Sequence, residues 1–185
     1  MKSILPGVAR EEFPALLVAR DYRVGAEIGV SQGHHAVHLL KGWLGFLILV
    51  DCWQHQDNKV YCDVAAGWTD PDQERNYCMT VESMAPYADR VKVMRAFSVE
   101  AAKDVPDESL DWVYIDANHS YHAVCEDLQA WYPKVRSGGL ISGHDFVDSG
   151  EPFGVKSAVL EFIQELPVDL YVSGEEWPTW HFEKP

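Results

Sequence analysis

Apolar and polar residues follow one another along the chain in blocks that predict strands and helices in regular succession. Phe46-Leu47-Ile48-Leu49-Val50 is an unbroken apolar run, which is typical of a strand buried on both faces of a sheet. The pattern predicts strands over residues 24–30, 46–50, 91–96, 110–115, 140–143, 168–172 and 177–183. It predicts helices over residues 10–19, 36–41, 71–88, 99–103, 120–132 and 155–166.

Strands that alternate with helices favour an α/β fold, here a Rossmann-like three-layer sandwich with a mostly parallel, twisted sheet between two helical layers. The last two strands are joined through Ser173-Gly174 with no helix between them, so we expect them to form an antiparallel pair. A length of 185 residues and a hydrophobic fraction of 47% suit one domain over residues 1–185.

Polar residues stand where the expected parallel strands end. These residues are Glu27, Asp51, Asp116, His144 and Asp145. Ligands of such sheets bind beyond the carboxyl ends of the strands. We therefore expect all five side chains to converge on one edge of the sheet.

The loop Glu27-Ile28-Gly29-Val30-Ser31-Gln32-Gly33 joins the first of these strands to a helix. Such a turn presents free N–H groups, and its glycines let a ligand approach the backbone closely. Asp51, after the next strand, can accept hydrogen bonds from a ribose, as in sites for NAD or S-adenosylmethionine. A pyrophosphate favours G-x-G-x-x-G, whereas here the third glycine is missing and an acid precedes the loop. Glu27 suits the sulfonium or amino group of S-adenosylmethionine instead.

The segments AEIGVSQG, LVDCW, VMRAFSVEAA, LDWVYIDANHSYHAVCEDLQAWYPKVRSGGLISGHDF and GVKSAVLEF resemble class I S-adenosylmethionine-dependent methyltransferases, and among them small single-domain enzymes. The resemblance implies that the cofactor is held by Glu27, Gly29, Gly33, Asp51, Trp53, Phe97, Ser98 and Asp116. Gly29 and Gly33 would line its methionine end, Asp51 its ribose, and the Phe97-Ser98 turn its adenine. For Trp53 a packing role stays open, and Ser98 is also expected to cap a helix.

Asp116 and His119 are the candidate catalytic residues, three positions apart after the fourth strand. Transfer of a methyl group to oxygen requires that a hydroxyl lose its proton, and histidine is suited to take it near neutral pH. This spacing is similar to that of metal-dependent sugar O-methyltransferases that act on macrolides. The resemblance implies a sugar or glycosylated metabolite as acceptor, His119 as the base, and a divalent metal.

In that family pattern the metal residues correspond to Asp116, His144 and Asp145. His144 departs from it, because it stands where the pattern has an acid. An imidazole is a poor ligand for Mg²⁺ and suits Mn²⁺, Fe²⁺ or Zn²⁺ better. Mg²⁺, another divalent metal, and a metal-free enzyme with His119 or His144 as base all stay open.

The composition narrows the choice of partners. The net charge of −14 disfavours nucleic acid and anionic membranes, so we expect a small-molecule acceptor. The N-terminus lacks a signal peptide and no apolar run approaches the ~20 residues of a membrane span, which predicts a cytoplasmic protein. Without a C-x-x-C pair, Cys52, Cys62, Cys78 and Cys125 are expected to be reduced thiols. The sequence does not predict an oligomeric state.

Several residues have less specific expectations. Residues 52–69 form a candidate lid, in which Trp53, Tyr61 and Trp68 could make an aromatic wall. Trp177 and Trp180 are expected to pack under the sheet edge. The histidines expected to be surface or packing residues are His34, His35, His38, His55, His122 and His181, with His34 the candidate exception because it lies at the helix mouth.

Two other functions use the same residues. One is a metal-dependent hydroxylase-like or hydrolase-like enzyme of the same fold, since fold alone does not determine function. The other is a non-catalytic protein that binds S-adenosylmethionine. A converging set of acids and histidines favours an enzyme over a binding protein, because binding alone does not need it.

Overall fold

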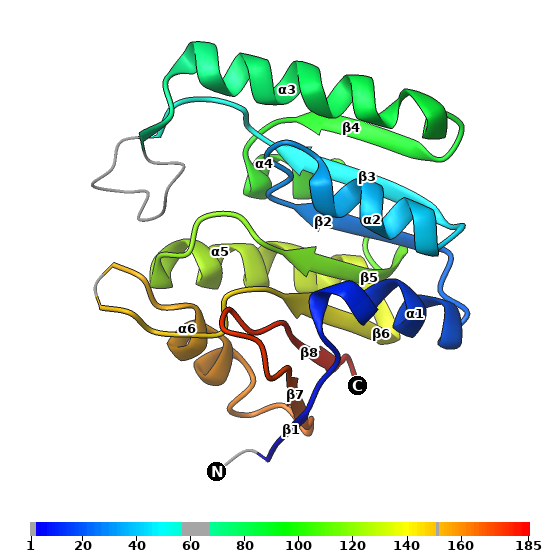
Figure 1. The fold of residues 1–185 in the computed structure, drawn as a ribbon. Coiled ribbons are helices and arrows are strands. Elements are labelled where there is room, and N and C mark those ends of the chain that lie inside the picture. Colours follow the sequence, from blue (N-terminus) through cyan, green and yellow to red (C-terminus); the bar gives the residue numbers. More distant parts are fainter. Residues whose placement is uncertain (1–2, 57–66, 151) are drawn as a thin grey trace.

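The computed structural model describes residues 3–56, 67–150 and 152–185, whose strands form one eight-stranded sheet (Figure 1). The strands are β1 (Ile4–Pro6), β2 (Val24–Ile28), β3 (Phe46–Asp51), β4 (Val91–Arg95), β5 (Leu110–Ile115), β6 (Val135–Gly143), β7 (Leu170–Val172) and β8 (Trp180–Glu183). Their order across the sheet is β1-β7-β8-β6-β5-β2-β3-β4. Neighbours run parallel except where β8 meets β6 and β7. The prediction of a mostly parallel sheet with a C-terminal antiparallel pair is confirmed.

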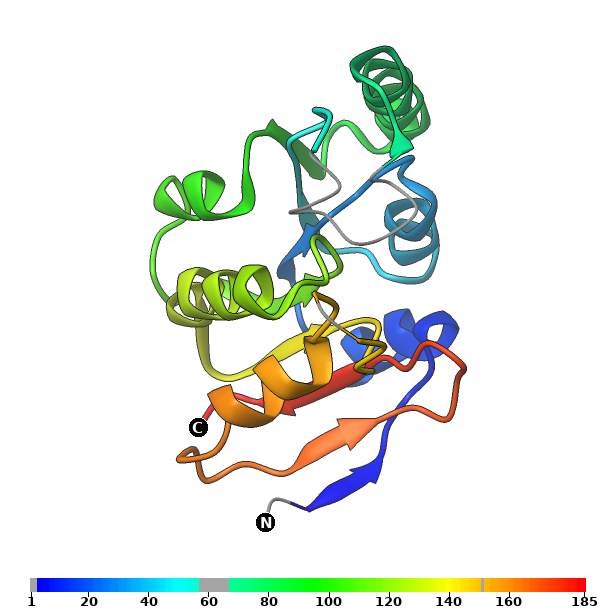
Figure 2. The same ribbon diagram turned by 90° about the vertical axis from the view of Figure 1, so that its left-hand side faces the viewer.

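Helices cover both faces of the sheet, as Figure 2 shows along its edge. The helices are α1 (Phe13–Ala19), α2 (His34–Gly42), α3 (Asp70–Met84), α4 (Ser98–Lys103), α5 (Tyr121–Trp131) and α6 (Val155–Phe162). Strand residues alternate between the two faces: Leu47 and Leu49 pack with α1, α2 and α3, whereas Ile48 and Val50 pack with α4, α5 and α6. Both faces of the central strands are therefore buried, which explains their continuous apolar runs.

Several element boundaries differ from the sequence prediction, most clearly at β1, β6 and α6. β1 was not expected; it has three residues and pairs with β7 at the sheet edge, too short for a recognisable pattern. β6 begins at Val135, before the predicted start at residue 140, and contains Gly138 at a φ angle of +73°. α6 ends at Phe162, before the predicted end at residue 166. β1 and the start of β6 depend on pairing with β7 and β5, which no local pattern shows.

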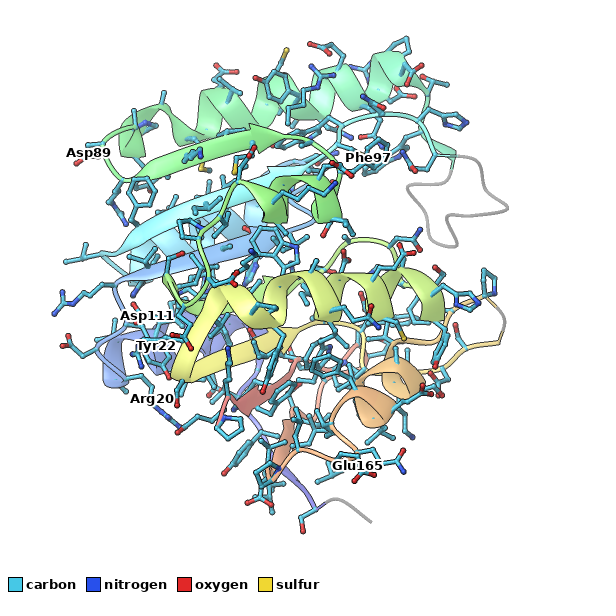
Figure 3. The ribbon with its side chains drawn as sticks, turned by 180° about the vertical axis from the view of Figure 1, so that it is seen from behind. Arg20, Tyr22, Asp89, Phe97, Asp111 and Glu165 are labelled. Atoms are coloured by element: carbon cyan, nitrogen blue, oxygen red, sulfur yellow. The ribbon has the colours of Figure 1, made fainter. Side chains whose placement is uncertain are left out.

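The order of the strands explains why the polar residues meet. β6, β5, β2 and β3 are consecutive neighbours, so their carboxyl ends lie side by side. In Figure 3, Phe97 lies at this carboxyl edge, opposite Tyr22 and Asp111. At the amino edge the Asp111 carboxylate accepts hydrogen bonds from the backbone N–H groups of Arg23 and Val24, at 2.6 and 2.9 Å. The predicted convergence on the carboxyl edge is confirmed.

The expectations for the candidate lid, the cysteines and membrane spans can be compared only with the described residues. Tyr61 and Cys62 lie outside the described residues, as do residues 57–66 of the candidate lid. Cys52, Cys78 and Cys125 carry free thiols. Within the described part of the chain, no helix is both long and apolar enough to cross a bilayer.

His181 in β8 should make the protein less stable in weak acid. Its ring is buried and stacks on Tyr171, with centroids 5.0 Å apart. Burial, together with the charge of Arg20, lowers the pKa of His181 to about 4, against about 6.5 in an unfolded chain. Between these values only the unfolded chain takes up the proton, so stability falls as pH falls from 6.5 to 4, by up to about 3 kcal/mol.

Urea unfolding at pH 7 and at pH 4.5 measures this contribution. The variant His181→Phe should lose less stability than the wild type between the two pH values. His55→Phe, which changes an exposed histidine, should behave like the wild type. Equal losses in His181→Phe and the wild type would show that His181 is protonated in the folded state.

Candidate active site

The loop between β2 and α2 is held in a conformation that requires glycine. Gly29 and Gly33 have φ angles of +88° and +78°. A Cβ on Gly29 would lie 2.0 Å from the carbonyl oxygen of Asp116, the residue after β5. Asp51 fixes the loop from the other side, because its Oδ2 accepts hydrogen bonds from the N–H groups of Val30 and Ser31 at 3.0 and 2.9 Å. The ends of β2, β3 and β5 are thus joined through this loop.

Four predicted residues form an acid–base cluster beyond β5 and β6. Nε2 of His119 lies 2.9 Å from Asp145 Oδ2 and 3.4 Å from Asp116 Oδ1. Nδ1 of His144 lies 3.2 Å from Asp145 Oδ1. The side chains of all four are 11–14% exposed, so little water competes for these contacts.

Arg10 joins this cluster from the N-terminal segment. Its Nη2 lies 2.7 Å from Asp116 Oδ2. Its backbone N–H is directed at the carboxylate of Glu175, with distances of 3.1 and 3.3 Å to the two oxygens. The guanidinium also lies over the ring of Tyr114, 5.6 Å from the centroid. Sequence analysis placed Arg10 only at the start of a helix.

Both acids of the cluster are ionised. Burial alone would raise the pKa of Asp116, but the hydrogen bond with His119 and the charge of Arg10 outweigh it and hold this pKa below its usual range. For Asp145, hydrogen bonds with His119 and His144 likewise outweigh burial and lower the pKa. Since ionised carboxylates only accept hydrogen bonds, Nε2 of His119 carries the hydrogen.

Two cavities open on either side of the glycine loop, with volumes of about 540 and 530 Å³. Gly29 and Asp51 line both of them. The first cavity also contains Arg10, Ser31, His34, Trp68, Asp116 and His119. The second contains Phe97, Ser98, Ala117, Asn118, Glu126 and Asp127. An elongated ligand that crosses Gly29 and Asp51 can therefore occupy both cavities.

Glu27 lies beneath the first cavity and is 1% exposed. Its Oε1 is 3.1 Å from Nδ1 of His35, which lines that cavity. Among the described residues, Glu27 Oε2 and His35 Nε2 are buried without a hydrogen-bond partner. An unpartnered buried carboxylate oxygen is costly, so this pair is suited to a cationic or hydrogen-bonding ligand group.

Ser98 lines the second cavity but does not cap α4 with its side chain. The N-cap residue is Phe97, and no side chain caps this helix. The Ser98 hydroxyl instead bonds to the carboxyl group of Asp127 and accepts a hydrogen bond from Nε1 of Trp131 at 2.9 Å. Burial raises the pKa of Asp127 to about 7, although the hydrogen bond from Ser98 opposes this shift. The expected cap is wrong because the hydroxyl points toward α5.

Comparison with known proteins assigns the chain to a family. A family model described as a methyltransferase domain matches residues 26–146, more than half of the chain. The chain belongs to this family. The match begins inside β2 and ends just after the His144-Asp145 pair, so it includes the loop, Asp51 and the acid–base cluster.

Solved structures show that this methyltransferase domain has the class I fold. An O-methyltransferase from Bacillus cereus in complex with SAH is 17% identical, with a TM-score of 0.70, over 95% of this chain and 80% of that one. TomG from Streptomyces achromogenes, an O-methyltransferase involved in tomaymycin synthesis and solved with SAM, is 13% identical, with a TM-score of 0.70, over 95% of this chain and 79% of that one.

One curated relative matches a shorter segment of this chain. The uncharacterized protein y4gI of Sinorhizobium fredii is 33% identical over 64 residues. These residues are 35% of this chain and 7% of that protein, so the match spans only a small part of the relative's length.

Three tryptophans with sequence predictions lie in different surroundings. Trp53 is 1% exposed, packs against Tyr77, and donates a hydrogen bond from Nε1 to the Ser31 carbonyl at 2.8 Å. It lines neither of these two cavities, and its contacts with Tyr77 and Ser31 match the packing role that the sequence left open. Trp180 is buried as predicted, whereas Trp177 is 45% exposed, beside Phe153.

The expected metal ligands come together, but their partners do not fit a resident divalent cation. Ligand atoms of Asp116, His144 and Asp145 lie within 4.8 Å of one another. However, each of the four carboxylate oxygens already has a nitrogen of Arg10, His119 or His144 within 3.4 Å. A divalent ion would have to displace these hydrogen bonds and lie next to a guanidinium.

Sequence reasoning missed three residues of the site: Arg10, His35 and Asp127. Arg10 and Asp127 carry no local signal, because their partners Asp116 and Ser98 are far away in sequence. His35 follows Glu27 by eight residues, after the strand–loop–helix turn. That spacing places a residue of the first helical turn near the strand end, and it could have indicated His35.

Proposed function

We propose that the protein is an S-adenosylmethionine-dependent O-methyltransferase that acts on a small molecule. The observation that carries this proposal is that His119, held by two carboxylates, lines the same cavity as the glycine loop. A candidate base and a candidate cofactor loop therefore face one space. S-adenosylmethionine supplies a methyl group bound to a positively charged sulfur.

The residues of the two cavities are suited to the parts of this cofactor. Glu27 and His35 offer buried polar atoms for its amino-acid end, beside Gly29. The Asp51 carboxylate has acceptor capacity for ribose hydroxyls beyond the backbone bonds it already accepts. Phe97 and Ser98 line the second cavity, where we place the adenine. Gly33 shapes the turn without lining either cavity.

His119 is the proposed general base. With its hydrogen on Nε2, directed at Asp145, the neutral ring carries its lone pair on Nδ1, an atom that is buried in the described structure. We propose that an acceptor that reaches Nδ1 gives up its hydroxyl proton to it. Asp145 and Asp116 then stabilise the imidazolium, as the carboxylate does in a serine protease triad. The backbone carbonyl of Asp116 packs closely against Gly29, so Asp116 links the proposed base to the glycine loop.

The surroundings of His119 suit a ring-shaped acceptor. The ring of Phe153 stacks on His119, with centroids 5.1 Å apart. On Phe153, in turn, lies the ring of Trp177, and these two centroids are 6.1 Å apart. Trp177 is about half exposed and offers a flat apolar face. We propose a sugar, a glycosylated metabolite or another ring-bearing alcohol as the acceptor. Among the described residues, no specific observation favours a hydroxylase, a hydrolase or a non-catalytic binding protein.

Calorimetric titration with S-adenosylmethionine and with NAD tests the cofactor. We expect binding of the former only, and absence of heat with S-adenosylmethionine would contradict the proposed function. Glu27→Gln removes the negative charge beneath the first cavity, so we expect an affinity lower by about 10–100-fold, the value of a hydrogen bond to a charged group. Glu82→Gln changes the net charge equally on the exposed face of α3 and should bind like the wild type.

A further inference from the structure

Contacts of both its backbone and its side chain hold Arg10 in place beside the acid–base cluster. Its backbone is tied to Glu175, its guanidinium lies over Tyr114, and its Nη2 contacts Asp116 at 2.7 Å. The side chain is only 27% exposed and lines the first cavity together with His119. The end of β5 and the segment of Glu175, both distant from Arg10 in sequence, therefore fix one positive charge beside Asp116.

We propose that Arg10 is the resident cation of this site, positioning Asp116 and excluding a divalent metal ion. The resemblance to metal-dependent sugar O-methyltransferases implies that Asp116 is a metal ligand. Here one oxygen of that aspartate is held by a guanidinium, and His144 stands where an acid would add the next negative charge. With both histidines neutral, two acids beside one arginine carry a net charge of only −1 to attract a divalent ion.

Arginine is suited to this role because its charge is permanent and its planar group donates several hydrogen bonds in a fixed geometry. Nη2 holds Asp116 Oδ2, so Asp116 Oδ1 stays directed at His119, 3.4 Å away. Arg10 thereby acts through Asp116 on the orientation of the base. The inference rests on the proposed function only in treating this cluster as the reaction centre.

Direct binding of Mn²⁺ tests the proposal without an acceptor or turnover. Calorimetry or electron paramagnetic resonance would compare the wild type with Arg10→Gln and Arg10→Lys. We expect Arg10→Gln to bind Mn²⁺ at least about tenfold more tightly than the wild type, because it removes a charge directly beside the ligand oxygen. Arg10→Lys keeps the charge and should bind like the wild type. Adding Asp116→Asn to Arg10→Gln should abolish the gain and thus localise the ion.

Two results would overturn the proposal. One is Mn²⁺ binding to the wild type that is lost in Asp116→Asn, a comparison that holds even when Arg10→Gln fails to fold. The other is a folded Arg10→Gln, checked by circular dichroism, that gains no affinity for Mn²⁺. Titration with S-adenosylmethionine runs in parallel. A wild type that binds neither Mn²⁺ nor this cofactor would contradict the proposed function but not the exclusion of metal by Arg10.

Discussion

Replacement of His119 with alanine is expected to lower the rate of methyl transfer by about 10²–10⁴-fold, the usual contribution of a general base. The physical reason is that the other acids of the cluster, Asp116 and Asp145, are held ionised by hydrogen bonds and a guanidinium and are weak bases. The affinity for S-adenosylmethionine should stay nearly unchanged, because the proposed cofactor contacts are made by other residues, on β2, the glycine loop, α2, β3 and the Phe97-Ser98 turn. Single-turnover kinetics with an accepted alcohol, together with calorimetry, would separate the two quantities.

His55→Ala is the matched control, since it removes an exposed histidine that lines neither of the two cavities. It should retain the wild-type rate. A His119→Ala enzyme that turns over within a few-fold of the wild type would show that another group takes the proton. Loss of cofactor binding in the same variant would instead assign His119 to the cofactor half of the site.

Gly29→Ala is expected to destabilise the fold by about 2–6 kcal/mol, the combined cost of a strained φ angle and an overpacked position. The new methyl group would stand 2.0 Å from the Asp116 carbonyl oxygen and 2.6 Å from Cα of Ala117. Both are backbone atoms at the end of β5, which cannot move without disturbing the sheet. Urea unfolding would measure the loss, and any folded fraction should bind S-adenosylmethionine more weakly.

Gly33→Ala and Gly174→Ala provide graded controls. At Gly33 the φ angle is also positive, but the nearest atoms are side-chain atoms of Thr80 and Ser83 at 3.2–3.3 Å, so the loss should be smaller. A Cβ on Gly174 would meet no atom within 4 Å beyond the adjoining residues of the described chain, so its replacement should change stability little. A Gly29→Ala protein as stable as Gly174→Ala would show that the loop can shift away from β5.

The residues of the proposed cofactor site were predictable from the sequence where they lie at the ends of strands. Glu27 and Asp51 follow apolar runs that only buried strands explain, and parallel strands bring their ends to one edge. Trp53 was less predictable. An aromatic residue directly after a strand can turn either to the ligand or to the core, and here the hydrogen bond to Ser31 and the contact with Tyr77 direct it to the core.

For the acid–base cluster, the sequence predicted which residues come together but not the balance of their charges. The strand order places Asp116 beside the His144-Asp145 pair, as expected. The sequence left the metal open because His144 could be read in two ways. The contacts that bear on the question come from Arg10, which lies on a segment before the first predicted strand and reaches Asp116 across the sheet edge.

By itself, the sequence determined the α/β class, the central strands and the polar residues at their ends. These features follow from periodicity and from residue types that act within a few positions of one another. Only the tertiary structure decided that Arg10 pairs with Asp116, that His35 pairs with Glu27, and that Ser98 bonds Asp127. Such contacts depend on side-chain directions and on the pairing of distant segments, which no local pattern encodes.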